Sequence, residues 1–178
     1  NNGNNTFSDI AQVAGISKTD WSWAPLLFDI DLDGHKDLYV TNGIKENALY
    51  RDAKTDIFAK QKELNRNLTI EELIELLPSR ITQNNIFKNT GNLKFKDVSI
   101  AWIKSNAINS NGAAYGDLDN DGDLDLVVNN MDAAASIINN KASSINNYLK
   151  LKLKNTKSKT TILGSKIKIV QKDKSQFQ

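Results

Sequence analysis

The stretches DIDLDGHKD at residues 29–37 and DLDNDGDLD at residues 117–125 share one pattern, D-x-D-x-D-G-x-x-D. Each is followed at once by an apolar run, Leu38–Val40 after the first and Leu126–Val128 after the second. Runs of this kind, rich in β-branched and aromatic residues, favour strands. We therefore expect two acidic loops, called loop one and loop two below, that each lead into a strand.

The likeness of the two loops belongs to a longer repeat. Residues 1–43 align with residues 89–131 at a constant offset of 88 without a gap, and 15 of the 43 positions are identical. Strands are also expected on the other side of the loops, at Ala24–Phe28 and Ala113–Tyr115. A unit with several short strands and roughly 40 to 50 residues has the size of one propeller blade. The sequence therefore predicts an all-β fold, a β-propeller fragment with two blades.

The residues between the two copies follow a different period. Asp56–Asn65 is a predicted helix, and Thr69 is expected to cap a second one, because Glu72 completes a capping box and Pro78 ends the apolar stripe. The predicted organisation is a blade at residues 1–43, a helical insertion at 44–83, a second blade at 84–140 and the start of a C-terminal β-domain at 141–178.

Composition and charge limit the classes of function. The 178 residues include no cysteine, which excludes disulfides, cysteine-ligated metals and thiol nucleophiles. No apolar run approaches the roughly 20 residues of a membrane-spanning helix, so no transmembrane segment is expected. The chain begins without Met or a signal-peptide core, and we expect it to be a piece of a longer polypeptide.

The net charge of +2 hides a basic tail. Residues 141–178 hold ten lysines and one acidic residue, whereas residues 1–140 are acidic overall. Leu149, Leu151 and Leu153 alternate with lysines, which predicts a strand with one buried and one solvated face. Without arginines or an aromatic ladder, no nucleic-acid binding is expected. Phosphate or acidic-glycan binding, or docking of the lysines on the acidic propeller, stays open.

The acidic loops predict two calcium sites. Carboxylates at alternate positions, followed by a glycine that allows a sharp turn, surround a hard cation with oxygen ligands, and calcium accepts six to eight of them. An EF-hand is excluded because position 12 is Val40 or Val128. Acidic turns without a cation would leave the crowded carboxylates repelling one another. The expected ligands are Asp29, Asp31, Asp33, His35 and Asp37 in loop one, and Asp117, Asp119, Asp121, Asp123 and Asp125 in loop two.

His35 and Asp123 hold the seventh position, from which a residue offers its backbone carbonyl. This position also separates the two loops in charge, because the Asp residues give loop two −5 and loop one −4. Lys36 weakens the field of loop one further. Loop two is therefore expected to bind calcium more tightly than loop one.

The second copy, NGAAYGDLDNDGDLDLVVN at residues 111–129, resembles the FG-GAP/VCBS repeats of integrin-type seven-bladed β-propellers. In those repeats this loop joins two strands and binds calcium. The first copy departs from the pattern at residues 21–25, WSWAP. The order of parts also resembles bacterial surface proteins related to cartilage acidic protein, in which an ASPIC/UnbV domain follows the propeller. The stretch NYLKLKL at residues 147–153 is similar to the opening of that domain.

The resemblance implies a calcium-binding module outside the cell, on a bacterial outer surface, that serves adhesion or recognises a protein or a glycan. Its other partners would be the remaining blades of the parent propeller. We expect no catalysis, because no Ser, Cys or Lys constellation accompanies His35 and the Asp residues around it are committed to the metal loops. Two alternatives stay open: the non-catalytic propeller of a larger polysaccharide-processing enzyme, and a calcium-stiffened spacer. Trp21 and Trp23 are expected to pack in the core or between blades, with carbohydrate stacking as the alternative.

Overall fold

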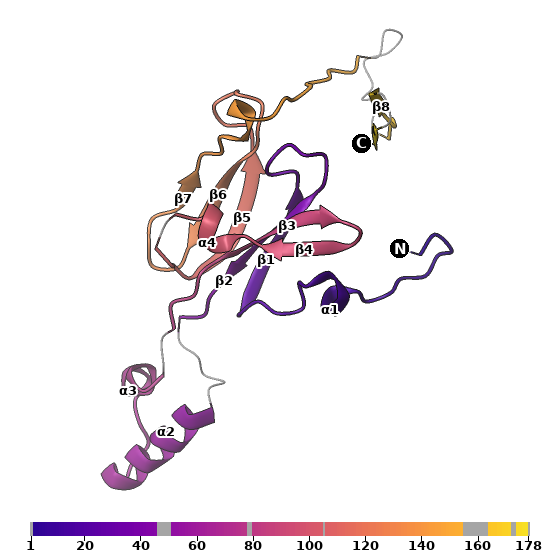
Figure 1. The fold of residues 1–178 in the computed structure, drawn as a ribbon. Coiled ribbons are helices and arrows are strands. Elements are labelled where there is room, and N and C mark those ends of the chain that lie inside the picture. The colour runs from indigo at the N-terminus through magenta and orange to yellow at the C-terminus, as the bar shows by residue number, and fades with distance from the viewer. Residues whose placement is uncertain are drawn as a thin grey trace.

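A computed structural model describes residues 2–45, 51–77, 80–104, 106–154, 164–171 and 174–177. Two antiparallel sheets form the main body, and a helical arm and a C-terminal hairpin extend from it (Figure 1). The described part is mostly β, as the all-β prediction requires. No helix in these ranges is both long and apolar enough to cross a membrane.

The first sheet has the order β1-β2-β3-β4, and the second has the order β5-β6-β7. All neighbouring strands within the two sheets are antiparallel. Their bounds are β1 (Ser22–Phe28), β2 (Asp37–Asn42), β3 (Asn85–Gly91), β4 (Lys94–Asp97), β5 (Ser110–Gly116), β6 (Asp125–Asn130) and β7 (Ser136–Ile138). The four predicted strands that flank the two loops are confirmed as β1, β2, β5 and β6.

The sequence repeat is also a structural repeat. β5 and β6 lie 88 residues after β1 and β2, and the short helix α4 (Ser99–Trp102) lies 88 residues after α1 (Ala11–Ala14). The sheets, however, do not coincide with the sequence units. β3 pairs with β2, and β4 pairs with β3 to complete the first sheet, so the unit at 84–140 contributes strands to both sheets.

The core lies where the two sheets meet. Phe28 at the end of β1 stacks on Tyr115 of β5, with ring centroids 4.5 Å apart. The buried cluster draws residues from both sheets and from the chain between them: Phe28, Ile30, Tyr39, Ile86, Ile103, Leu126 and Val128. Trp21 and Trp23 do not join it, since they are 37% and 50% exposed. The expectation was wrong as far as it concerned the core, and its other part, packing between blades, stays a prediction.

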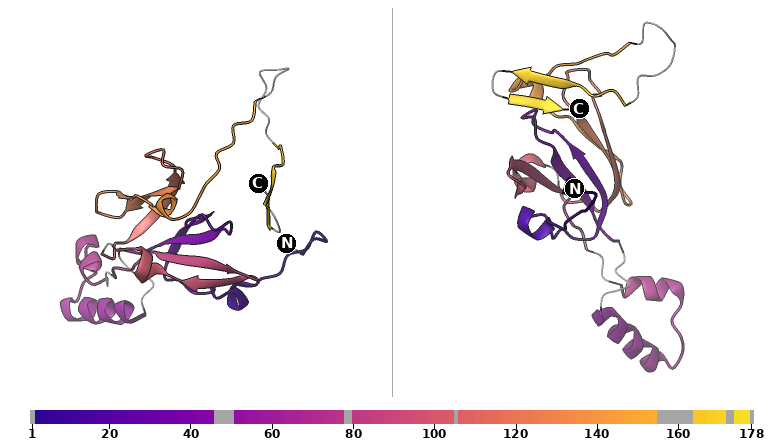
Figure 2. Two further views of the ribbon diagram at one scale, coloured as in Figure 1. Left: turned by 45° about the horizontal axis from the view of Figure 1, so that its top comes forward. Right: turned by 90° about the vertical axis from the view of Figure 1, so that its right-hand side faces the viewer.

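The helical insertion joins β2 to β3 within one sheet. α2 (Arg51–Leu64) and α3 (Ile70–Glu75) lie away from both sheets (Figures 1 and 2). The predicted capping box is confirmed, because the Thr69 side chain accepts from the Glu72 N–H and the Glu72 carboxylate accepts from the Thr69 N–H. Pro78, expected to end this helix, lies outside the described residues.

The chain after β7 forms the 3₁₀ turn η1 (Ala142–Ser144) and later the hairpin of β8 (Lys168–Gln171) and β9 (Lys174–Phe177). The strand predicted at Leu149–Leu153 is not observed. Residues 147–154 have no regular structure, and the three leucines are 64%, 48% and 47% exposed. An alternating pattern buries one face only where a neighbouring strand or layer covers it, and no strand in the described ranges pairs with this one.

Candidate metal centres

Both acidic loops join paired antiparallel strands. Loop one connects β1 to β2, and loop two connects β5 to β6. The fourth position of each loop has positive φ, +58° at Leu32 and +61° at Asn120, and so has the glycine at the sixth position, +91° at Gly34 and +96° at Gly122. Asn and Gly tolerate this backbone region and Leu does not. The two loops therefore share one backbone form, which loop one adopts with a residue that disfavours it.

The last aspartate of each loop is buried and holds the loop closed. Asp37 Oδ2 accepts from the Ile30 N–H at 3.1 Å, and its Oδ1 accepts from the Asn89 N–H at 2.7 Å. Asp125 repeats this arrangement with the N–H groups of Leu118 at 3.0 Å and Asn140 at 2.8 Å. These aspartates fix the two ends of each loop to each other and to a further segment, β3 for loop one and the chain just after β7 for loop two.

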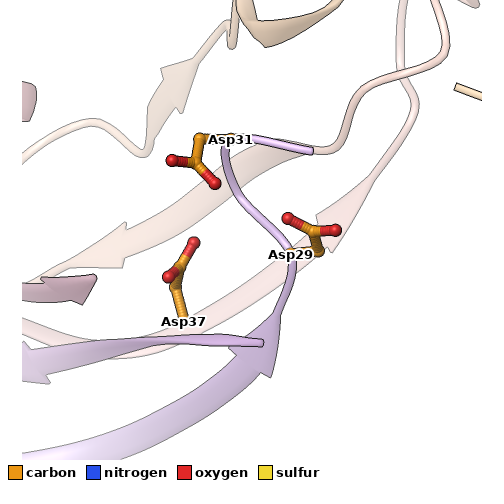
Figure 3. Close-up of side chains that lie close together, drawn as sticks. All are labelled: Asp29, Asp31 and Asp37. Carbon is orange, nitrogen blue, oxygen red and sulfur yellow. The ribbon is translucent and has the colours of Figure 1, made fainter. Parts of the chain in front are cut away.

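Loop one gathers three carboxylates around one point (Figure 3). Asp29, Asp31 and Asp37 each offer an oxygen, and these oxygens all lie within 4.8 Å of one another. The loop backbone shapes this cluster, since Asp29 accepts from the N–H groups of Asp33 at 3.1 Å and Gly34 at 2.9 Å. Among the described residues, Oδ1 of Asp31 is buried and accepts no hydrogen bond.

Burial disfavours the ionised form of two carboxylates of loop one, Asp29 and Asp37. Burial raises the pKa of Asp37 to about 6, against the lowering effect of its two backbone hydrogen bonds, and Asp31 and Asp33 raise it further. Burial is also the main cause that raises the pKa of Asp29. A cation bound beside such carboxylates would stabilise their ionised form.

Loop two gathers a related set. Asp117, Asp119 and Asp121 each offer an oxygen within 4.8 Å of the others. Asp123 is fully buried; its Oδ2 accepts from the Ser143 N–H at 2.8 Å, and its Oδ1 accepts no hydrogen bond from the described residues. Asp125 stays outside the group and serves as the closing residue described above.

The structure thus brings together six of the ten residues predicted as ligands. Asp33 is turned to a lysine instead, since its Oδ2 lies 3.1 Å from Nζ of Lys88. His35 is exposed, and its N–H donates to Asp33 Oδ1 at 2.9 Å. His35 and Asp123 belong to neither three-residue group, which counts side-chain atoms alone. Their expected role through the backbone carbonyl stays a prediction.

Sequence reasoning missed a segment that contacts both loops, residues 139–150, called the crossing segment below (Figure 1). Asn140 donates to the Ile30 carbonyl at 2.6 Å, and Asn146 donates to the Asp31 carbonyl at 2.7 Å. Tyr148 lies directly against Gly122, where an added Cβ would come within 2.0 Å of its ring. Lys150 pairs with Asp117 at 3.2 Å, which places one lysine of the basic tail on an acidic loop, one of the options the sequence left open.

The comparisons with known proteins support one part of this description. Residues 73–128 match the family model of the FG-GAP-like repeat. The matched range runs from α3 through β3, β4 and β5 to β6, and it contains all of loop two. Neither the curated proteins nor the solved structures gave a match.

The described part has two antiparallel sheets related by an internal repeat, and the FG-GAP-like match suggests an integrin-like β-propeller module. Residues 73–128 thus carry an FG-GAP-like repeat, and residues 1–43 form a second copy of its part at 89–131 in sequence and strands.

Proposed function

We propose that this chain is a calcium-binding β-propeller module of an extracellular or cell-surface protein. The observation that carries the proposal is the three-carboxylate group found in both loops, with its oxygens within 4.8 Å of one another. Calcium–oxygen bonds of about 2.3–2.6 Å place ligand oxygens no more than about 5 Å apart across the ion. The spacing therefore suits a single calcium ion in each loop.

The charge balance of the loops supports the same reading. Loop one holds four aspartates within nine residues and loop two holds five, and the pKa of Asp37 is raised to about 6. The buried oxygen of Asp31 without a donor is suited to a cation ligand. Magnesium fits less well, since it needs near-ideal octahedral geometry and keeps several waters.

The full ligand set that we propose adds the remaining loop residues. In loop one Asp33 would turn inward and His35 would offer its carbonyl. In loop two Asp125 and the carbonyl of Asp123 would complete the shell. The ions would stabilise the loops that join β1 to β2 and β5 to β6, and they would take no part in catalysis.

Calcium titration of the metal-free chain by calorimetry tests the proposal, with about two sites per chain expected. With an extracellular-type Kd of about 10⁻⁴ M, millimolar calcium stabilises the fold by about 1–2 kcal/mol per site. The melting temperature should then fall by several degrees on adding chelator. A folded chain that binds no calcium would refute the proposal.

The biological role that we propose is adhesion or recognition of a protein or a glycan at the surface of a bacterium. Its support is the FG-GAP-like repeat, which suggests an integrin-like module. The remaining blades and the start of an ASPIC/UnbV domain at residues 141–178 belong to the same proposal. Binding of the chain to a glycan array, with and without chelator, would test the glycan arm, and calcium-dependent signals are expected.

A further inference from the structure

Lys88 and Asn139 hold equivalent places beside the two loops. Leu38 pairs with Phe87 in the first sheet, and its repeat partner Leu126 pairs with Ile138 in the second. The next residues are therefore Lys88, in β3, and Asn139, just after β7. The residues after these agree, because the N–H groups of Asn89 and Asn140 both donate to the closing aspartate of their loop.

The two equivalent side chains differ in the charge that they bring to their loops. The Lys88 ammonium hydrogen-bonds Asp31 and lies 3.1 Å from Asp33 Oδ2, and it faces the ring of Trp102 at 5.9 Å. Asn139 places a neutral amide on Asp119, the repeat partner of Asp31, at 2.8 Å. A positive charge in one loop thus corresponds to an uncharged donor in the other.

Lys88 is also held more firmly than the lysines near loop two. Its side chain is 30% exposed, whereas those of Lys141 and Lys150 are 67% and 70% exposed. Lys141 reaches Asp119 and Asp121 only at 3.6 and 4.0 Å. Solvated ammonium groups such as Lys141 and Lys150 are easily displaced, and a half-buried one between two carboxylates is not.

The three-carboxylate groups of the two loops also differ in their members. Asp121 belongs to the three-residue group of loop two, but its repeat partner Asp33 is absent from the group of loop one. Asp33 is the residue that Lys88 contacts besides Asp31. The lysine therefore engages two of the four aspartates that a calcium ion in loop one would use.

We propose that Lys88 is a built-in counter-ion of loop one, which must withdraw its ammonium group from Asp31 and Asp33 before a divalent cation can bind there. The inference rests on the proposed calcium binding and assigns a different behaviour to each loop. An ion bound through the free Oδ1 of Asp31 would lie close to the ammonium held at Oδ2 of the same carboxylate, and two cations at this distance repel. Loop one therefore takes calcium weakly and by exchange, and loop two takes it directly.

Reciprocal exchange of the two side chains tests the inference. Loop one is isolated in an Asp119→Ala background and loop two in an Asp31→Ala background, and calcium affinity is measured by calorimetry. Lys88→Asn should raise the affinity of loop one roughly tenfold or more, and Asn139→Lys should lower that of loop two by a similar factor. Lys88→Arg, which keeps the charge, should leave loop one weak.

Lys36→Asn is the matched control, because it removes the same charge from loop one at an exposed residue for which no contact with the carboxylates is observed. Its gain in affinity should be clearly smaller than that of Lys88→Asn. A second readout needs no affinity: without calcium Lys88→Asn should lower the melting temperature, and millimolar calcium should reverse the order of variant and parent.

The outcomes separate the two proposals. If loop two binds calcium and Lys88→Asn leaves loop one unchanged or weaker, the counter-ion role is refuted while calcium binding stands. If neither loop binds calcium in any variant, both proposals fall. If the parent binds one ion and Lys88→Asn binds two, the counter-ion role is supported in its strongest form.

Discussion

Gly43 lies where the first sheet meets the second, and Gly43→Ala should be severely destabilising. Its φ is +142°, and an added Cβ would lie 2.5 Å from Cβ and 2.6 Å from Cα of Asn109. Asn109 cannot move away, because it accepts from the Thr82 N–H, donates to the Ile44 carbonyl and accepts from the Met131 N–H. The strained backbone costs about 1–3 kcal/mol and the overpacking about 1–3 kcal/mol more.

Gly91→Ala supplies the matched control. Gly91 also has positive φ, +82°, but nothing lies within 4 Å of an added Cβ. The control should therefore show the backbone cost alone, about 1–2 kcal/mol. Urea unfolding followed by tryptophan fluorescence gives both free energies of unfolding, and we expect Gly43→Ala to lose at least about 1 kcal/mol more. Equal losses for the two variants would show that the contact with Asn109 yields freely, and the reasoning would be wrong.

Three further changes test other parts of the fold. Thr69→Ala should cost about 1 kcal/mol of local helix stability by removing the capping box, seen as faster amide exchange in α3 with the sheets unchanged. Asn140→Ala should lower the free energy of unfolding by about 1–3 kcal/mol, because its amide joins the two loops; a loss equal to that of Asn139→Ala, whose bond is exposed, would contradict this. Leu32→Asn should raise the melting temperature, because Asn tolerates the positive φ of this position better than Leu does; an unchanged or lower value would count against strain at that residue.

Local patterns predicted the parts of the fold that local chemistry decides. The loops, their flanking strands and the capping box depend on residues close together in the chain. Some identities in the repeat also have a structural cause. Ser22 donates to Asn42 Oδ1 at 3.1 Å and thereby joins β1 to β2. Ser110 donates to Asn130 Oδ1 at 2.9 Å and joins the equivalent strands β5 and β6.

The contacts that the sequence did not predict join residues far apart in the chain. β3 returns to β2 only after the helical insertion, so nothing near loop one in the sequence points to Lys88. The crossing segment reaches Ile30 and Asp31 from more than one hundred residues away. The strand predicted from the alternation of leucine and lysine at residues 149–153 was wrong for the same reason. Periodicity indicates which face of a strand is apolar, but it does not indicate whether a neighbouring strand or layer covers that face.

The crossing segment also determines how the chain would respond to force. A pull on the residues beyond Lys150 reaches Lys150, Tyr148 and Asn146 before it reaches any strand of the two sheets. These contacts follow one another along the segment, so a pull breaks them one at a time. In a pair of strands pulled along their length, the hydrogen bonds share the load and must break together. Under tension the crossing segment would detach from the acidic loops first and leave both sheets intact.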